Sequence, residues 1–216
     1  MCFSAAASFS AGAVCAGVGS MAVRRAGKPD LMLAFIPVIF ALHQTLEGVV
    51  WATHGEGWGR YAGYAFAIVA FCLWPIYVPV AAWMSESDPR RRKLILFFIA
   101  LGGVMVALGA QALYSGLTID FATHQIRYLP IMRYPLAFDY VYASCAAAPL
   151  LLHRNVYLKV FGCSILVFFV VSIFFFNPAR YSVWCFFAAL GSAVVYRFVA
   201  SSGARASSEK VDRLFR

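Results

Sequence analysis

The sequence predicts an all-α, polytopic membrane protein with seven transmembrane helices, its N-terminus outside and its C-terminus in the cytoplasm. Of the 216 residues, 62% are hydrophobic and only 12% are charged, whereas soluble domains carry about 25% charged residues. The mean hydropathy is +0.77, and the apolar residues gather into runs long enough to cross a bilayer as helices. The basic residues concentrate in alternate loops between these runs, which is typical of a multi-pass membrane protein.

A short basic loop separates the first two runs. Residues 4–23 are rich in alanine, glycine and serine, which allow helices to pack closely within a membrane. Arg24 and Arg25 follow this run, which is the reverse of the order in a cleavable signal peptide. Residues 31–53 form the second predicted helix, and Pro37 is expected to kink it.

The third predicted helix, residues 61–84, contains two prolines. It follows a glycine-rich turn over residues 54–60, and it carries Trp74-Pro75 at mid-span with Pro79 four residues beyond. Since proline has no N–H to donate, this spacing opens the helix backbone locally. We expect a proline kink with a packed tryptophan here, and a gate is the alternative.

The fourth predicted helix, residues 94–117, follows a basic loop over residues 88–93. The longest loop, residues 118–133, comes next, and in it apolar residues alternate with polar ones. A period of two is typical of strands, so this loop is predicted to form a β-hairpin or lid at the outer end.

The last three helices are predicted over residues 134–152, 156–176 and 181–200. Residues 1–200 thus form a single seven-helix domain. The tail, residues 201–216, is polar and of mixed charge, so we expect it to be a disordered segment or a short surface helix in the cytoplasm.

The distribution of lysine and arginine predicts the orientation. Fourteen of the 18 basic residues fall at the end of the helices that holds Arg24, the 88–93 loop and the tail, and four fall at the other end. The positive-inside rule makes the first end cytoplasmic, in the inner (plasma) membrane of a bacterium. We expect these charges to contact anionic lipid headgroups. Because the net charge of +9 lies in such loops, nucleic acid is not an expected partner.

Polar residues inside the second helix mark a candidate site. His43, Gln44, Glu47 and Trp51 fall on one face at 3.6 residues per turn. A charge at the centre of a membrane costs about 2.5–3.5 kcal/mol on insertion scales. This face is therefore expected to turn into the helix bundle and away from lipid.

The predicted topology brings further polar residues to the same outer level. Glu47 and Asp139 are the acids placed inside spans, and both fall toward the outer end. This indicates one shared polar pocket that opens outward. The predicted ligand-binding residues are Glu47, Gln44, Trp51, Gln111, Asp139, Tyr142, Tyr181 and Trp184.

A divalent metal ion is one candidate occupant of this pocket. His43 and Glu47 are four residues apart on one helix face, and imidazole and carboxylate are common metal ligands. Cys2 is a further candidate ligand if Met1 is removed, because a free amine and a thiolate would then lie together. Ser4 is expected to cap the first helix and so to hold Cys2 over the mouth of the bundle. The alternative is a hydrogen-bonded clamp between helices without a metal.

Several short motifs resemble a bacterial family of integral membrane proteins of unknown function. These motifs are Met1-Cys2-Phe3-Ser4-Ala5, Gln44 with Glu47-Gly48 and Trp51, Trp74-Pro75, and residues 181–189. The resemblance spans nearly the whole chain and implies no activity. The layout is also similar to that of membrane hydrolases such as the alkaline ceramidases and the progestin/adiponectin receptors. Those proteins hold zinc with three histidines, including a pair in the last helix, whereas residues 181–200 contain no histidine.

Three functions from different classes fit these residues. The first hypothesis is a protein that binds, senses or transports a small polar or cationic ligand in the outward pocket. The second is a membrane-embedded, metal-dependent hydrolase that uses His43 and Glu47. The third is a structural subunit of a membrane complex. No glycine-rich phosphate loop or serine-hydrolase motif is present.

Overall fold

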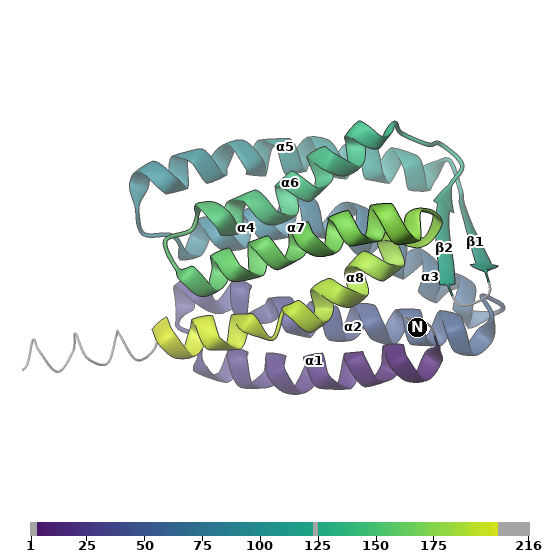
Figure 1. The fold of residues 1–216 in the computed structure, drawn as a ribbon, viewed down its shortest axis with the longest axis horizontal. Coiled ribbons are helices and arrows are strands. Elements are labelled where there is room, and N and C mark those ends of the chain that lie inside the picture. Colours follow the sequence, from purple (N-terminus) through teal and green to yellow (C-terminus); the bar gives the residue numbers. More distant parts are fainter. Residues whose placement is uncertain (1–3, 123–124, 203–216) are drawn as a thin grey trace, which may run out of the picture.

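Residues 4–122 and 125–202, which the computed structural model describes, form seven helical rods side by side with a two-stranded hairpin at one end (Figure 1). The elements are α1 (Ala5–Arg25), α2 (Leu31–Thr53), α3 (Trp58–Ile68), α4 (Trp74–Ser85), α5 (Pro89–Tyr114), β1 (Leu117–Ala122), β2 (Gln125–Pro130), α6 (Leu136–Leu152), α7 (Val156–Phe176) and α8 (Arg180–Gly191). A π-helical turn joins α3 and α4 into one rod, and the last rod continues beyond α8 to Ser202. We call the end with the strands the hairpin end and the opposite end the basic end.

The lengths of the rods agree with the predicted class. In the described part of the chain, six rods have 21 to 28 residues and are apolar enough to cross a membrane. α6 is shorter, with 17 residues. The prediction of an all-α protein with seven helices is thus confirmed, and the six long apolar helices support a multi-pass membrane protein. The direction in which the chain crosses the membrane stays a prediction.

Local capping explains where two helices begin. The Ser4 hydroxyl accepts a hydrogen bond from the Ala7 N–H at 3.2 Å, as predicted for the start of α1. α5 begins at Pro89, five residues earlier than predicted, because Asp88 accepts a hydrogen bond from the Arg90 N–H at 2.8 Å. Proline also favours the first turn of a helix. The basic residues 90–93 therefore belong to α5 and not to a loop.

The prolines of the third rod shape its contact with α5. Pro75 and Pro79 cannot donate to the carbonyls four residues earlier, those of Phe71 and Pro75. Both carbonyl oxygens lie directly against glycines of α5. A Cβ placed on Gly109 would lie 2.7 Å from the Phe71 oxygen, and one on Gly102 would lie closer still to the Pro75 oxygen. The two glycines, one heptad apart, thus let α5 approach an opened backbone.

α1 and α2 also approach closely. A Cβ on Gly19 would lie 2.8 Å from the backbone nitrogen of Val38, and a Cβ on Gly48 would lie 2.6 Å from the ring of Phe9. Small residues thus let the two helices pack along much of their length, as the composition of residues 4–23 predicts.

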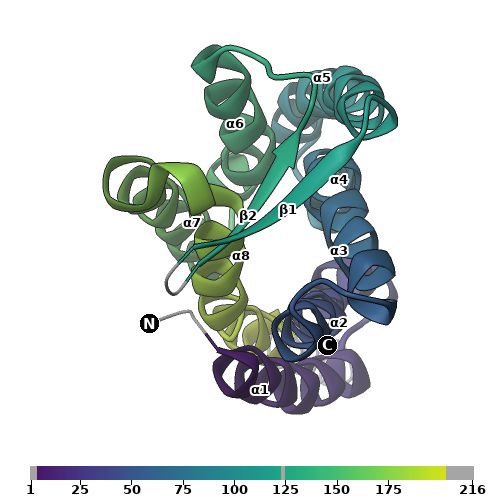
Figure 2. The ribbon, with the colours of Figure 1, turned by 90° about the vertical axis from the view of Figure 1, so that its right-hand side faces the viewer.

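The hairpin covers one end of the bundle. β1 and β2 pair as antiparallel strands, with Asp120 opposite Arg127, and the side chains of these two residues form an ion pair of 3.4 Å. Figure 2 looks onto this end and shows the strands lying across it. Ile126 and Tyr128 are buried on the face that turns toward the helices. The alternating pattern of residues 118–133 therefore corresponds to a β-hairpin with one face packed on the end of the helix bundle.

A buried carboxylate fastens two turns together at the basic end. Glu86 is only 2% exposed. Its two oxygens accept hydrogen bonds from the backbone N–H groups of Asp88 at 2.9 Å and Arg154 at 2.7 Å. His153 Nδ1 lies 4.0 Å from the carboxylate. Burial lowers the pKa of His153, and the carboxylate of Glu86 partly offsets this. The α4–α5 turn is thereby tied to the α6–α7 turn.

Candidate functional site

The polar face of α2 lies inside the bundle. His43 and Gln44 are fully buried and Glu47 is 1% exposed, as their helical spacing predicts. Trp51, one turn further on, is half-buried and packs edge-on against Phe121 of the hairpin, with 5.8 Å between ring centroids. The face therefore points toward other protein segments along its whole length.

In the described part of the chain, Glu47 has a close hydrogen-bond partner in Ser182 and the side-chain amide of Gln44 nearby. The hydroxyl of Ser182, on α8, donates to the Glu47 carboxyl group. Among the ion pairs of the described residues, none involves Glu47. Tyr128 and Cys185 lie near enough to interact electrostatically with Glu47. Three elements, α2, α8 and β2, thus converge on this carboxyl.

A stack of three rings forms one wall of the site. The His43 and Phe66 rings lie 4.0 Å apart at 22°, and the Phe66 and Tyr128 rings lie 4.3 Å apart at 14°. His43 Nε2 lies 3.2 Å from the Phe66 carbonyl oxygen. Because a carbonyl only accepts, Nε2 carries the hydrogen and Nδ1 presents a lone pair. Burial raises the pKa of Tyr128 well above its usual value, and Glu47 raises it further, so its phenol remains a donor.

Several buried polar atoms at this site have no hydrogen-bond partner among the described residues. They are both amide atoms of Gln44, Nδ1 of His43, the hydroxyl of Tyr128 and Nε1 of Trp51. Proteins leave few buried polar groups unpaired, and ordered water or a bound ligand often supplies the partner. The atoms around Glu47 include donors and acceptors, so they suit water or a small polar guest.

The other predicted binding residues lie elsewhere. Asp139 accepts a hydrogen bond of 2.5 Å from the Tyr181 hydroxyl and forms an ion pair of 3.0 Å with Arg180. Gln111 is exposed, and its side-chain oxygen accepts a hydrogen bond of 3.0 Å from Tyr134. In the described part of the chain, neither residue forms a hydrogen bond or ion pair with Glu47, so one shared pocket stays a prediction.

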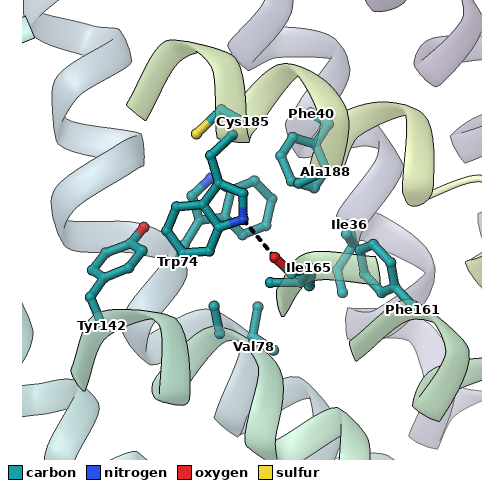
Figure 3. Close-up of a pocket in the computed structure, with 11 residues that line it drawn as sticks. Ile36, Phe40, Trp74, Val78, Tyr142, Phe161, Ile165, Cys185 and Ala188 are labelled. Atoms are coloured by element: carbon teal, nitrogen blue, oxygen red, sulfur yellow. Dashed lines mark hydrogen bonds between the residues drawn. The ribbon is translucent and has the colours of Figure 1, made fainter. Parts of the chain in front are cut away.

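Tyr142 and Trp184 lie in a different group of side chains, in the middle of the bundle. They line an apolar cavity of about 30 Å³ together with Phe40, Trp74 and Ile165 (Figure 3). The Tyr142 hydroxyl donates to the Ala70 carbonyl, and Trp184 Nε1 donates to the Ile165 carbonyl at 3.0 Å. With their polar atoms paired, these two residues act as packing groups here.

The proposed metal ligands do not assemble among residues 4–122 and 125–202. No group of three His, Cys, Asp or Glu side chains within these ranges is placed to hold a metal ion. His43 uses Nε2 for the Phe66 carbonyl. Cys2 lies outside the described residues, so its proposed role over the mouth of the bundle stays a prediction.

Two important residues of the site were not among those predicted. Ser182 supplies the hydrogen bond to Glu47, and Tyr128 places a phenol beside it. Ser182 follows the predicted Tyr181 directly, so neighbouring residues of α8 reach the two buried acids of this end. Tyr128 belongs to the alternating pattern of the loop, which was the available signal for a residue facing inward.

Comparison with known proteins gives one match. A family model described as a family of unknown function (DUF6629) matches residues 1–210. No curated protein and no solved structure matches the chain.

Proposed function

Because the chain belongs to the DUF6629 family of unknown function, we propose from its own contacts that this membrane protein binds a proton or small cationic ligand at Glu47. The observation that carries the proposal is a buried carboxyl that has a hydroxyl partner but no ion-pair partner in the described part of the chain.

Comparison with the other buried acids supports this role. Asp139 is neutralised by Arg180, and Glu86 accepts two backbone N–H groups and lies beside His153. Both are thus compensated within the fold. Among the described residues, Glu47 accepts a hydrogen bond from the Ser182 hydroxyl and has the side-chain amide of Gln44 nearby, but no cationic group pairs with it. An ionised carboxylate in hydrocarbon is costly without a positive partner, so Glu47 must hold a proton or attract a cation.

The surroundings of Glu47 favour the smallest ligands of this class. The unpaired atoms of Gln44, His43 and Tyr128 supply hydrogen-bonding positions for water molecules around the carboxyl. A proton needs no cavity at the carboxyl, and a small cation with one or two water molecules needs only a small one. Binding, sensing or transport of such a ligand is the function these contacts support best.

We also propose that the hairpin end faces the periplasm of a bacterial cell and that the basic end faces the cytoplasm. The loop charges support this orientation, which leaves Arg90, Arg91, Arg92 and Lys93 beside the anionic headgroups of the inner leaflet. Reporter fusions after Arg92 and after Arg216 are expected to be active as cytoplasmic fusions, and a fusion after Trp58 as a periplasmic one. A periplasmic signal from the fusion at Arg216 would refute this orientation.

Infrared spectroscopy of the protein in lipid tests the role of Glu47. The wild-type spectrum is expected to contain a band from a protonated carboxyl shielded from water, and this band should weaken when a bound cation replaces the proton. Glu47→Gln keeps the size of the side chain and an acceptor for Ser182, and it should remove the band. Glu56→Gln, in an exposed turn, is the matched control and should leave it unchanged. An identical band in Glu47→Gln would rule out the proposal.

A further inference from the structure

A second, open cleft lies at the hairpin end, and it shares Tyr128 with the surroundings of Glu47. It has a volume of about 240 Å³ and lies between β2, the segment 131–135, α6 and the start of α8. Its polar lining includes Arg133, Tyr134, Arg180 and Tyr181, and its apolar lining includes Phe71 and Phe138. The size suits a single small organic molecule.

The arginine on one side of this cleft is held in place by several contacts. Arg180 forms an ion pair of 3.0 Å with Asp139, donates to the side-chain and backbone oxygens of Asn177, and lies 4.7 Å over the ring of Tyr181. Tyr181 in turn donates to the other oxygen of Asp139. Both carboxylate oxygens are therefore occupied, and Asp139 does not offer the cleft an open negative site.

The arginine on the other side is uncompensated. Arg133 is exposed, and none of the ion pairs of the described residues involves it. Arg180 and Asp139 cancel in charge, so Arg133 leaves the cleft with a net positive charge of one. The hydroxyl of Tyr134 already donates to Gln111. The cleft thus presents a fixed guanidinium, a free guanidinium and apolar walls, but no free carboxylate.

We propose that this cleft binds a small anion with a carboxylate or phosphate group next to an apolar part. Guanidinium groups bind both kinds of oxyanion through paired N–H donors, and Phe71 and Phe138 provide a surface for the apolar part. The same chemistry belongs to free aromatic carboxylates and to anionic lipid headgroups. The proposal rests on Arg133 and Arg180, neither of which contacts Glu47 through a hydrogen bond or ion pair among the described residues, although Tyr128 borders both places.

Calorimetry in a neutral detergent tests the soluble source, with benzoate and inorganic phosphate as the probes. Native mass spectrometry after exchange into phosphatidylglycerol or phosphatidylcholine tests the lipid source. Binding of benzoate or phosphate, or selective retention of phosphatidylglycerol, supports the site and identifies its source. Arg133→Gln is expected to weaken the interaction about tenfold, the usual effect of losing one charge-assisted hydrogen bond. Arg180 stays unchanged in this experiment because its removal would leave Asp139 without a counter-charge.

Arg60→Gln is the matched control. Arg60 is also exposed at the hairpin end, on α3, but it does not line the cleft. An equal loss in both variants would show a general effect of surface charge and would overturn the proposal. Absence of binding by benzoate, phosphate and phosphatidylglycerol in the wild-type protein would overturn it as well. A loss in Glu47→Gln is not expected, so failure of the Glu47 proposal and failure of this one are distinguishable.

Discussion

Gly102→Val is expected to abolish the folded bundle, whereas Gly103→Val leaves it intact. A Cβ on Gly102 would overlap the Pro75 carbonyl oxygen, which belongs to backbone and cannot turn aside. A Cβ on Gly103 meets no atom within 4 Å. Overpacking a core typically costs about 1–3 kcal/mol and occasionally more, and here the overlap with backbone would force α5 away from the third rod.

The two glycines are adjacent in one helix, so the change in helix propensity is the same for both variants. Fluorescence-detected size-exclusion chromatography of detergent extracts measures the result. Gly103→Val should give a single symmetric peak like that of the wild-type protein, and Gly102→Val should give aggregate or no peak. Matching profiles for the two variants would show that α5 does not need this close approach.

Glu86→Ala is expected to lower the stability of the solubilised protein by about 3 kcal/mol or more. The change removes the acceptor of the partly buried hydrogen bonds from the N–H groups of Asp88 and Arg154, and a hydrogen bond to a charged group contributes about 1.5–3 kcal/mol. Glu56→Ala, in an exposed turn, should have little effect. The midpoint of thermal unfolding in detergent provides the comparison. A midpoint for Glu86→Ala equal to that of Glu56→Ala would contradict the fastening role.

The same cluster gives a direction for pH dependence. Burial lowers the pKa of His153, so the folded state favours the neutral imidazole. Its contribution to stability is therefore present above about pH 6.5, the usual histidine pKa, and declines as the pH falls below it. Glu86 opposes this shift, so Glu86→Ala should make the decline at acidic pH steeper. Midpoints of thermal unfolding, measured from pH 8 to pH 5, give the pH dependence of stability for the wild-type protein and for Glu86→Ala.

The fold was predictable where a pattern repeats along the chain. Apolar runs of membrane length predict the helices, and the alternation in residues 118–133 indicates the hairpin. Helix ends were less predictable because they depend on single side chains. Asp88 and Pro89 start α5 before a run of basic residues that resembles a loop. Gly116, with φ of 113°, ends the same rod before β1, three residues short of the predicted end.

The site was predictable only in part, for a similar reason. The 3.6-residue period places His43, Gln44 and Glu47 inside the bundle. It cannot identify Ser182, because one serine in an apolar helix carries no periodic signal. Nor does it separate Glu47 from Asp139, because both are single acids in apolar runs and the Arg180 that pairs with Asp139 is distant in sequence. Contacts between distant segments decide these pairings.

The short length of α6 affects the surrounding lipid. Seventeen residues span about 25 Å at 1.5 Å per residue, whereas the hydrocarbon core of a bilayer is about 30 Å thick. Leu136 and Tyr140 are exposed on this helix, so we expect lipid tails to adjoin it. If α6 crosses the membrane as predicted, we expect the bilayer to thin on this flank, which is one way to accommodate a short span, and to bring headgroups level with residues 131–135.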